Sequence, residues 1–168
     1  MSGCSGSRPF ANALLALIVA AASGGLGNAQ APGTPPPKDT IFARKILMGS
    51  IDSKMGEIET MLAPEGRLDA AEAQEHADTI SIMLMAFPHL FPAETNQWKP
   101  GADRDPATDT FASPDVWTNF PEFYGRATNA SKIAQDAGTT RRLAYFRRLV
   151  GELRAGCNGC HERFMKTE

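Results

Sequence analysis

The stretch LAYFRRLVGELRAGCNGCHERF, residues 143–164, contains both a helical pattern and a chemical motif. Its apolar residues recur every three or four positions, which is typical of an amphipathic helix that faces a core. The pentad at 157–161 has the form C-x-x-C-H, which is the pattern of covalent haem attachment. The residues of the apolar stripe are Leu143, Phe146, Val150, Leu153, Cys157, Cys160 and Phe164.

The spacing of the pentad suits a flat macrocycle. On a helix, Cys157, Cys160 and His161 stand at i, i+3 and i+4 and therefore lie on one face. The two thiols can then form thioethers with the haem vinyl groups, and the histidine becomes the proximal ligand of the iron. Asn158 and Gly159 point elsewhere and are expected to be free to vary. Since both cysteines belong to the core-facing stripe, the motif and the predicted packing agree.

Other uses of the two cysteines need partners that are hard to find in this chain. A C-x-x-C pair can be a redox dithiol or half of a zinc site, but no βαβ pattern surrounds it and the only other cysteine is Cys4. A zinc site would need His76 or His89 from distant positions. The remaining alternative is a disulfide-bonded or free pair beside a surface histidine. The sequence has no acid pair, nucleophile triad or glycine-rich phosphate loop, so we expect no enzyme.

The length and net charge of the chain further limit its possible functions and partners. The chain has 168 residues, which suits one domain. Lys plus Arg is 17 and Asp plus Glu is 19, so the net charge is −2. No basic run is present, and nucleic acid is therefore not an expected partner. Nine Phe, two Trp, two Tyr and seven Met supply a core, and methionine adapts well to an irregular apolar ligand.

Residues 1–29 are typical of a secretory signal peptide. Arg8 precedes an apolar run at 10–22, and Gly27 and Ala29 stand at the −3 and −1 positions for cleavage before Gln30. An uncleaved anchor is the alternative. No later apolar stretch is long enough to cross a bilayer. We therefore expect a mature protein that is soluble, not bound to a membrane, and periplasmic if the cell is bacterial.

Two helices are predicted after a flexible, proline-rich leader at 30–38. The first begins near Lys38, with Asp39 or Thr40 as its cap, and ends before the turn at 63–66. The second spans about 69–86 with Asp69 as its cap. The apolar stripe of the first helix is Ile41, Met48, Ile51, Met55, Ile58 and Leu62, and Arg44 occupies the one polar position in it. The stripe of the second helix is Ala73, Ala77, Ile80, Leu84 and Phe87.

The connection at 88–112 is longer than an ordinary antiparallel turn. Its prolines exclude a long helix. Phe91, Trp98 and Phe111 indicate that it packs on the rest of the protein. We assign it no chemistry.

Two more helices follow the connection. Ser113-Pro114-Asp115 is a strong start signal, and Pro121 should kink the helix or open a turn. The third helix is expected to end at Gly138, and Thr139 or Thr140 to cap the fourth. The domain at 39–168 is therefore predicted to be all-α: an antiparallel four-helix bundle with covalently bound haem inside it.

From about residue 39 to its end the chain resembles class II c-type cytochromes, the cytochrome c-prime family. The features are the C-terminal position of C-x-x-C-H, Arg44 early in the first helix, Gly56 twelve residues later, and Ser-Pro-Asp-Val-Trp at 113–117. The resemblance implies one haem c. Class I cytochromes have an N-terminal motif and a downstream ligating methionine. Here the only downstream methionine, Met165, follows His161 on the same helix and cannot reach the opposite face of the iron.

The resemblance implies two possible distal sites. In one branch of the family a methionine of the first helix is the sixth ligand, and the protein carries electrons. In the other the iron is five-coordinate and binds nitric oxide or carbon monoxide. By register from Arg44, the distal position falls on Met48, which is either this ligand or a core methionine over the haem. Met55 and Met61 are expected to pack.

Other family features remain open in the sequence. Arg44 corresponds to an arginine that approaches a haem propionate, and the alternative is a surface arginine. The family often has a basic residue where this chain has Met165, and Arg163 and Lys166 stand beside it. The expected partners are redox proteins. A homodimer through the first two helices is possible, although Lys45, Lys54 and Glu59 suggest no clear apolar face there.

Overall fold

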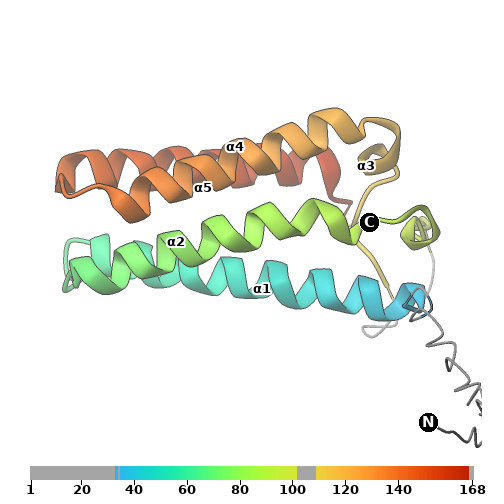
Figure 1. Cartoon of the computed structure of the whole chain (residues 1–168), viewed down its shortest axis with the longest axis horizontal. Helices are drawn as coiled ribbons and strands as arrows, with labels where there is room; N and C mark the ends of the chain where they lie inside the picture. Colours follow the sequence, from blue (N-terminus) through green and yellow to red (C-terminus); the bar gives the residue numbers. More distant parts are fainter. Residues whose placement is uncertain (1–32, 34, 102–108, 167–168) are drawn as a thin grey trace, which may run out of the picture. The chain divides into compact units, whose positions relative to one another are not determined.

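The computed structural model describes residues 33, 35–101 and 109–166. The predicted signal peptide at 1–29 and most of the predicted leader therefore lie outside the described residues. Four long helices run up and down in an antiparallel bundle (Figure 1). They are α1 Pro37–Leu62, α2 Ala70–Ala86, α4 Phe120–Thr139 and α5 Leu143–Phe164. Within the described ranges the β-structure is one isolated bridge. The predicted all-α four-helix bundle is confirmed.

The four helices do not pack equally closely. Helix α2 packs along α4, α4 along α5, and α1 along α2, whereas α1 and α5 touch over a shorter length. The N-terminus of α1 and the C-terminus of α5 lie at the same end of the bundle (Figure 1). None of the helices formed by the described residues is both long and apolar enough to span a bilayer.

The buried apolar side chains form two clusters. The aromatic cluster consists of Phe91, Val116, Phe123 and Phe164. The larger one, called here the aliphatic cluster, holds the four helices together and contains most of the predicted stripe positions. Its buried members are Ile51, Met55, Ile58, Ala73, Ala77, Ile80, Leu84, Ala130, Ala134, Ala137, Phe146, Leu149, Val150 and Leu153.

The first two helices show one correct and one wrong cap prediction. The carboxylate of Asp69 accepts hydrogen bonds from the backbone N–H groups of Ala71 (3.0 Å) and Glu72 (3.1 Å), so it caps α2 as predicted. Helix α1 begins earlier than expected, at Pro37, and its N-cap residue makes no side-chain capping bond. Asp39 therefore lies inside the first turn. Proline fits the first position because it has no N–H that needs an acceptor.

The predicted third helix is divided in two. A single turn, α3 Asp115–Thr118, is followed by Asn119 with φ −123° and ψ 38°, outside the helical region. Helix α4 then starts at Phe120 with Pro121 in its first turn. Pro121 thus opens a new helix rather than kinking one, because its fixed φ suits a first turn. The Oγ of Ser113 accepts from the N–H of Asp115 at 3.2 Å. Pro114, rather than the predicted Ser113, occupies the N-cap position of α3, and it makes no side-chain capping bond.

The junction between the last two helices differs slightly from the prediction. Helix α4 continues one residue past Gly138, and Arg142 occupies the N-cap position of α5 without a side-chain capping bond. The predicted threonine cap is therefore wrong. Thr140 is two residues too early, and its Oγ1 instead accepts from the N–H of Arg142 at 3.3 Å.

The connection after α2 packs on the bundle, as predicted. It contains two short 3-10 turns, η1 Phe87–Leu90 and η2 Ala93–Thr95, and no long helix in its described part. Phe91 is buried and Trp98 is half-buried, whereas Phe111 is 39% exposed. The connection therefore covers the bundle at the end where α1 begins and α5 finishes.

Candidate functional site

A cavity of about 510 Å³ separates the first half of α1 from the end of α5. This volume is typical of small-molecule and cofactor sites. Its position explains why α1 and α5 touch over only part of their length. Helix α1 contributes Arg44, Lys45, Met48, Gly49 and Asp52, the end of α5 contributes Cys160, His161, Phe164 and Met165, and the remaining wall is Phe87, Phe91, Thr110, Phe111, Ala112, Val116 and Phe123.

Two of the predicted site residues meet at this cavity from different helices. His161 is half-buried on α5, and Met48 is half-buried on α1. Their side chains offer an imidazole nitrogen and a thioether sulfur, the pair that holds iron in cytochromes with a histidine and a methionine ligand. The walls between them are mainly apolar and aromatic. The donor set and the lining therefore fit a haem.

The two cysteines contact different parts of the core. Cys160 lines the cavity and packs against the aromatic cluster, whereas Cys157, one turn earlier, packs against the aliphatic cluster. Both are free, half-buried thiols. Burial raises the pKa of Cys157 and of Cys160 above the usual thiol value. A redox dithiol needs a lowered pKa, so the raised values argue against that alternative.

Arg44 is buried, with 4% of its surface exposed, so the surface alternative considered for it is wrong. Its guanidinium donates to Thr95 Oγ1 at 3.0 Å, to the Thr95 carbonyl at 3.2 Å and to Thr110 Oγ1. It also lies 4.5 Å from the centroid of the Phe91 ring and 5.7 Å from that of Trp117. Thr95 and Thr110 both belong to the connection at 88–112, so these contacts attach it to α1 at two points.

The charge of Arg44 is not balanced by the residues around it. Its contacts with the described residues are carbonyls, hydroxyls and aromatic rings, all of them uncharged. Burial lowers its pKa to about 10, which still leaves the guanidinium charged at neutral pH. A buried cation without an opposite charge is unfavourable. Because Arg44 lines the cavity, an anionic group on the molecule bound there would relieve this cost.

A second wall of the cavity comes from residues to which the sequence assigned no chemistry. Thr110, Phe111 and Ala112 form a strap along the end of α5. The Phe111 carbonyl accepts from the N–H of Lys166 at 2.7 Å, and the N–H of Ser113 donates to the Phe164 carbonyl at 2.8 Å. No periodic pattern marks this segment, so only its threonine and aromatic side chains hinted at a buried role.

The other candidate ligands lie away from the cavity. His89 is exposed, with its ring centroid 6.2 Å from that of Tyr124. His76 lies in a stretch whose sequence looks exposed, yet its side chain is buried, with 7% of its surface exposed. Its Nε2 lies 2.7 Å from Glu57 Oε2 without hydrogen-bond geometry. Among the described residues no cluster of three His, Cys, Asp or Glu side chains suits a metal ion.

The two other methionines of α1 pack as predicted. Met55 is buried in the aliphatic cluster, and Met61 packs against it near the end of the helix. Neither lines the cavity. Of the three methionines considered on α1, Met48 is thus the one beside His161.

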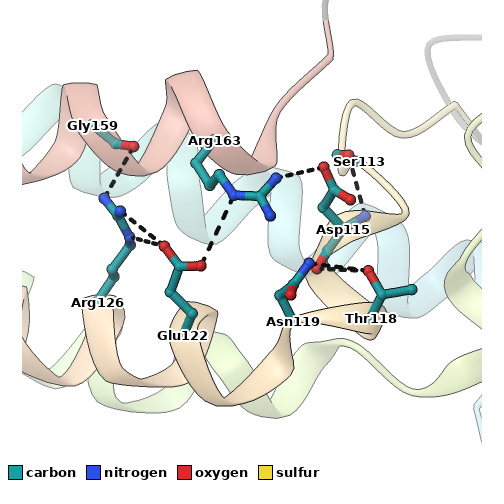
Figure 2. Close-up of polar contacts among 8 residues, drawn as sticks. All are labelled: Ser113, Asp115, Thr118, Asn119, Glu122, Arg126, Gly159 and Arg163. Carbon is teal, nitrogen blue, oxygen red and sulfur yellow. Dashed lines mark hydrogen bonds and ion pairs between the residues drawn. The ribbon is translucent and has the colours of Figure 1, made fainter.

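An ion-pair network covers the outer side of the motif (Figure 2). Arg163 lies 2.6 Å from a carboxylate oxygen of Asp115, so its charge is directed onto α3. Arg126 of α4 contacts Glu122 at 2.9 Å and donates to the carbonyl of Gly159 at 3.3 Å. The sequence treated Gly159 as a spacer, and its backbone contact was missed because helical spacing describes only side chains.

Comparisons with known proteins show the family of the chain. A model of the family described as Cytochrome C′ matches residues 39–165. Cytochrome c-556 of Agrobacterium tumefaciens (strain II Chrys) is 28% identical over 133 residues, covering 74% of this chain and 94% of its own. The crystal structure of cytochrome c′ from Rubrivivax gelatinosus has a TM-score of 0.65 at 26% identity, covering 77% of this chain and 97% of its own.

A further solved cytochrome c′, described as having ligand-controlled dimer dissociation, has a TM-score of 0.67 at 20% identity and covers 80% of this chain and 99% of its own. That likeness concerns the fold. Since the family model spans nearly the whole bundle and includes the C-x-x-C-H motif, the chain belongs to the cytochrome c′ family of electron-transferring or gas-binding proteins, and its cofactor is covalent haem c.

Proposed function

We propose that this protein is a one-electron carrier whose haem is bonded to Cys157 and Cys160, with His161 as the proximal and Met48 as the distal ligand of the iron. The observation that carries the proposal is that Met48 and His161, on different helices, line the same cavity.

The haem supplies one-electron chemistry through its iron, which alternates between Fe(III) and Fe(II). The residues of the chain do the rest. The imidazole of His161 on α5 and the thioether of Met48 on α1 would hold the iron in both oxidation states. The thioether favours the reduced iron because it is a soft ligand. The aromatic cluster excludes water, which disfavours the additional charge of the oxidised state.

Arg44 is the proposed partner of a haem propionate. Support comes from its burial, its position on the cavity wall and its uncharged contacts. A carboxylate in the cavity would form a charge-assisted hydrogen bond with it. The same interaction would hold the connection at 88–112 over the haem.

The ligand assignment can be tested with Met48→Leu, which removes the sulfur while keeping most of the volume. Absorption spectra of the ferric and ferrous forms should change from low-spin to high-spin, and the ferrous variant should bind carbon monoxide readily. Met61→Ala is the matched control, because Met61 is also a half-buried methionine of α1 but does not line the cavity. Its spectrum should equal that of the wild type.

The competing function is gas binding at a five-coordinate iron, with Met48 as a steric cover. It is favoured by the packing of Met48 against the aliphatic cluster, which a non-ligating methionine would also show. A high-spin ferrous wild-type protein, or a Met48→Leu spectrum that matches the wild type, would refute the electron-carrier proposal and support this one.

The proposal extends to location and partners. With residues 1–29 as a cleaved signal peptide, the mature protein would be periplasmic and would exchange electrons with other redox proteins through small, weak encounters. A homodimer is also proposed. The outer sides of α1 and α2 expose Phe42, Ile46, Ile82 and Met85, each more than half accessible, which corrects the expectation of no apolar face there. Sedimentation of wild type and Ile46→Glu tests it, since the dimer should dissociate in the variant.

A further inference from the structure

The contact between Arg126 and Gly159 joins α4 directly to the haem motif. Gly159 stands between the two cysteines of C-x-x-C-H, and its carbonyl accepts from Arg126 Nη1 at 3.3 Å (Figure 2). Glu122, one turn earlier on α4, holds the same guanidinium from its other side: its Oε1 lies 3.0 Å from Arg126 Nε and 2.9 Å from Nη2. The charge is therefore fixed beside the motif rather than extended into solvent.

Gly159 immediately precedes Cys160, and the Cys160 side chain lines the cavity. The hydrogen bond from Arg126 to the Gly159 carbonyl therefore places a positive charge next to the backbone that carries Cys160. A haem bonded to Cys160 would lie within the electric field of this charge.

We propose that Arg126 is a positioning residue that, held by Gly159 and paired with Glu122, sets the reduction potential of the haem. The inference rests on the haem attachment at Cys160 in the function proposed above, and it does not depend on Met48 as a ligand. Reduction adds one electron to Fe(III) and gives Fe(II), so the oxidised site has one more positive charge. A nearby cation therefore favours reduction, and a nearby carboxylate opposes it.

Removing the charge of Arg126 and removing that of Glu122 should shift the reduction potential of the haem in opposite directions. Arg126→Gln should lower the equilibrium constant for reduction about threefold, which is a fall of about 28 mV for one electron. Glu122→Gln should raise the constant by a similar factor. Arg126→Lys keeps the positive charge, so its reduction potential should stay close to that of the wild type. Both side chains are more than 40% exposed, so these substitutions should not unfold the protein.

Lys132 provides the matched control. It stands on the same helix and forms an ordinary i to i+4 ion pair with Asp136 at 3.5 Å, away from the motif. Lys132→Gln makes the same charge change as Arg126→Gln. Its potential should move by less than half as much, because the more distant charge is screened more strongly.

The experiment is a redox titration of the four holoprotein variants and the wild type at one ionic strength, with spectra recorded throughout. Opposite shifts for Arg126→Gln and Glu122→Gln, with rescue by Arg126→Lys, support the inference. Shifts of the same sign, failure of the rescue, or a shift no larger than that of Lys132→Gln overturn it. The spectra report the spin state separately, so a wrong assignment of Met48 would be recognised independently of the potentials.

Discussion

The two ends of the bundle are built from different side chains. At the closed end, where α1 finishes and α5 begins, the core is the aliphatic cluster. There Arg154 of α5 makes paired hydrogen bonds to Glu59 of α1 at 2.7 and 2.8 Å. At the cavity end the same two helices are separated by a cavity of about 510 Å³. It is lined by the aromatic cluster and by the buried Arg44, whose contacts with the described residues are all uncharged.

The comparison shows that residues of the chain fill the core at the closed end, whereas they leave a gap at the cavity end. At the closed end the helices bury apolar surface against one another, and the ion pair Arg154–Glu59 joins α5 to α1. The cavity end leaves a gap between helices, and among the described residues no anion contacts Arg44 there. Both features are costly unless something compensates for them, since a gap loses packing contacts and a buried charge without a partner is unfavourable. We propose that haem c compensates for both, so stability at the cavity end should depend on it.

The largest effect should follow from loss of the haem. In Cys157→Ala/Cys160→Ala, a denaturing gel should show no haem stain. Amide exchange around Thr95 and Thr110 should accelerate by about a hundredfold or more, while the closed end stays protected. Cys4→Ala, in the predicted signal peptide, should leave the stain unchanged. Equal loss of protection at both ends would contradict the comparison.

The next largest effect should come from the closed end. Ile58, near the end of α1, is fully buried in the aliphatic cluster. Ile58→Ala leaves a cavity there and should lower the free energy of unfolding by about 2–5 kcal/mol, measured by denaturant titration of the holoprotein. Because Ile58 does not line the cavity between α1 and α5, the absorption spectrum should not change. A spectral change would show that the two ends are more strongly coupled than their separation suggests.

A smaller loss is expected at the cavity end from Arg44→Ala. It removes hydrogen bonds to Thr95 and Thr110 and the cation–π contact with Phe91, and should cost about 2–3 kcal/mol. The long connection should also become sensitive to limited proteolysis. The control is Arg147→Ala, whose guanidinium donates to the Leu62 carbonyl at the closed end on an exposed surface. It should change stability by less than about 0.5 kcal/mol.

The smallest effect concerns the residue that precedes the strap. Lys45 of α1 lies 2.7 Å from Asp109, which is mostly buried. Asp109→Asn should lower the free energy of unfolding by about 1 kcal/mol or less, as for a partly screened ion pair. The more exposed pair Arg148–Glu152 provides the control, and Arg148→Gln should change stability by less than Asp109→Asn. A loss larger than that of Arg44→Ala would mean that the strap, not Arg44, secures the connection.

Much of the fold followed from local patterns. The stripes of α1 and α2 and the capping role of Asp69 were predicted correctly, because apolar periodicity and capping chemistry act within a few residues. The stripe of α5 was wrong at Leu143, which is 48% exposed. The start of α1 was predicted to within one residue, but its cap was misplaced by three or four residues and that of α5 by two or three, since several polar residues near a helix end compete for one position. The break at Asn119 was read only as a kink or turn for the same reason.

Only part of the candidate site could be predicted from the sequence. The haem motif needs three side chains on one turn, so five consecutive residues were enough to indicate it. The burial of Arg44 depends on Thr95 and Thr110, 51 and 66 positions away. The strap depends on backbone bonds to the end of α5, and backbone bonds leave no mark in residue type.

The amino-acid order alone was therefore sufficient for the four helices, the covalent cofactor and the helix that holds it, because each depends on spacing within a few turns. Packing in three dimensions decided that Met48 and His161 border one cavity, that Arg44 is buried, and that Arg126 reaches the motif. These features join residues far apart in the chain, and their distances are set by how whole helices pack, which no local pattern encodes.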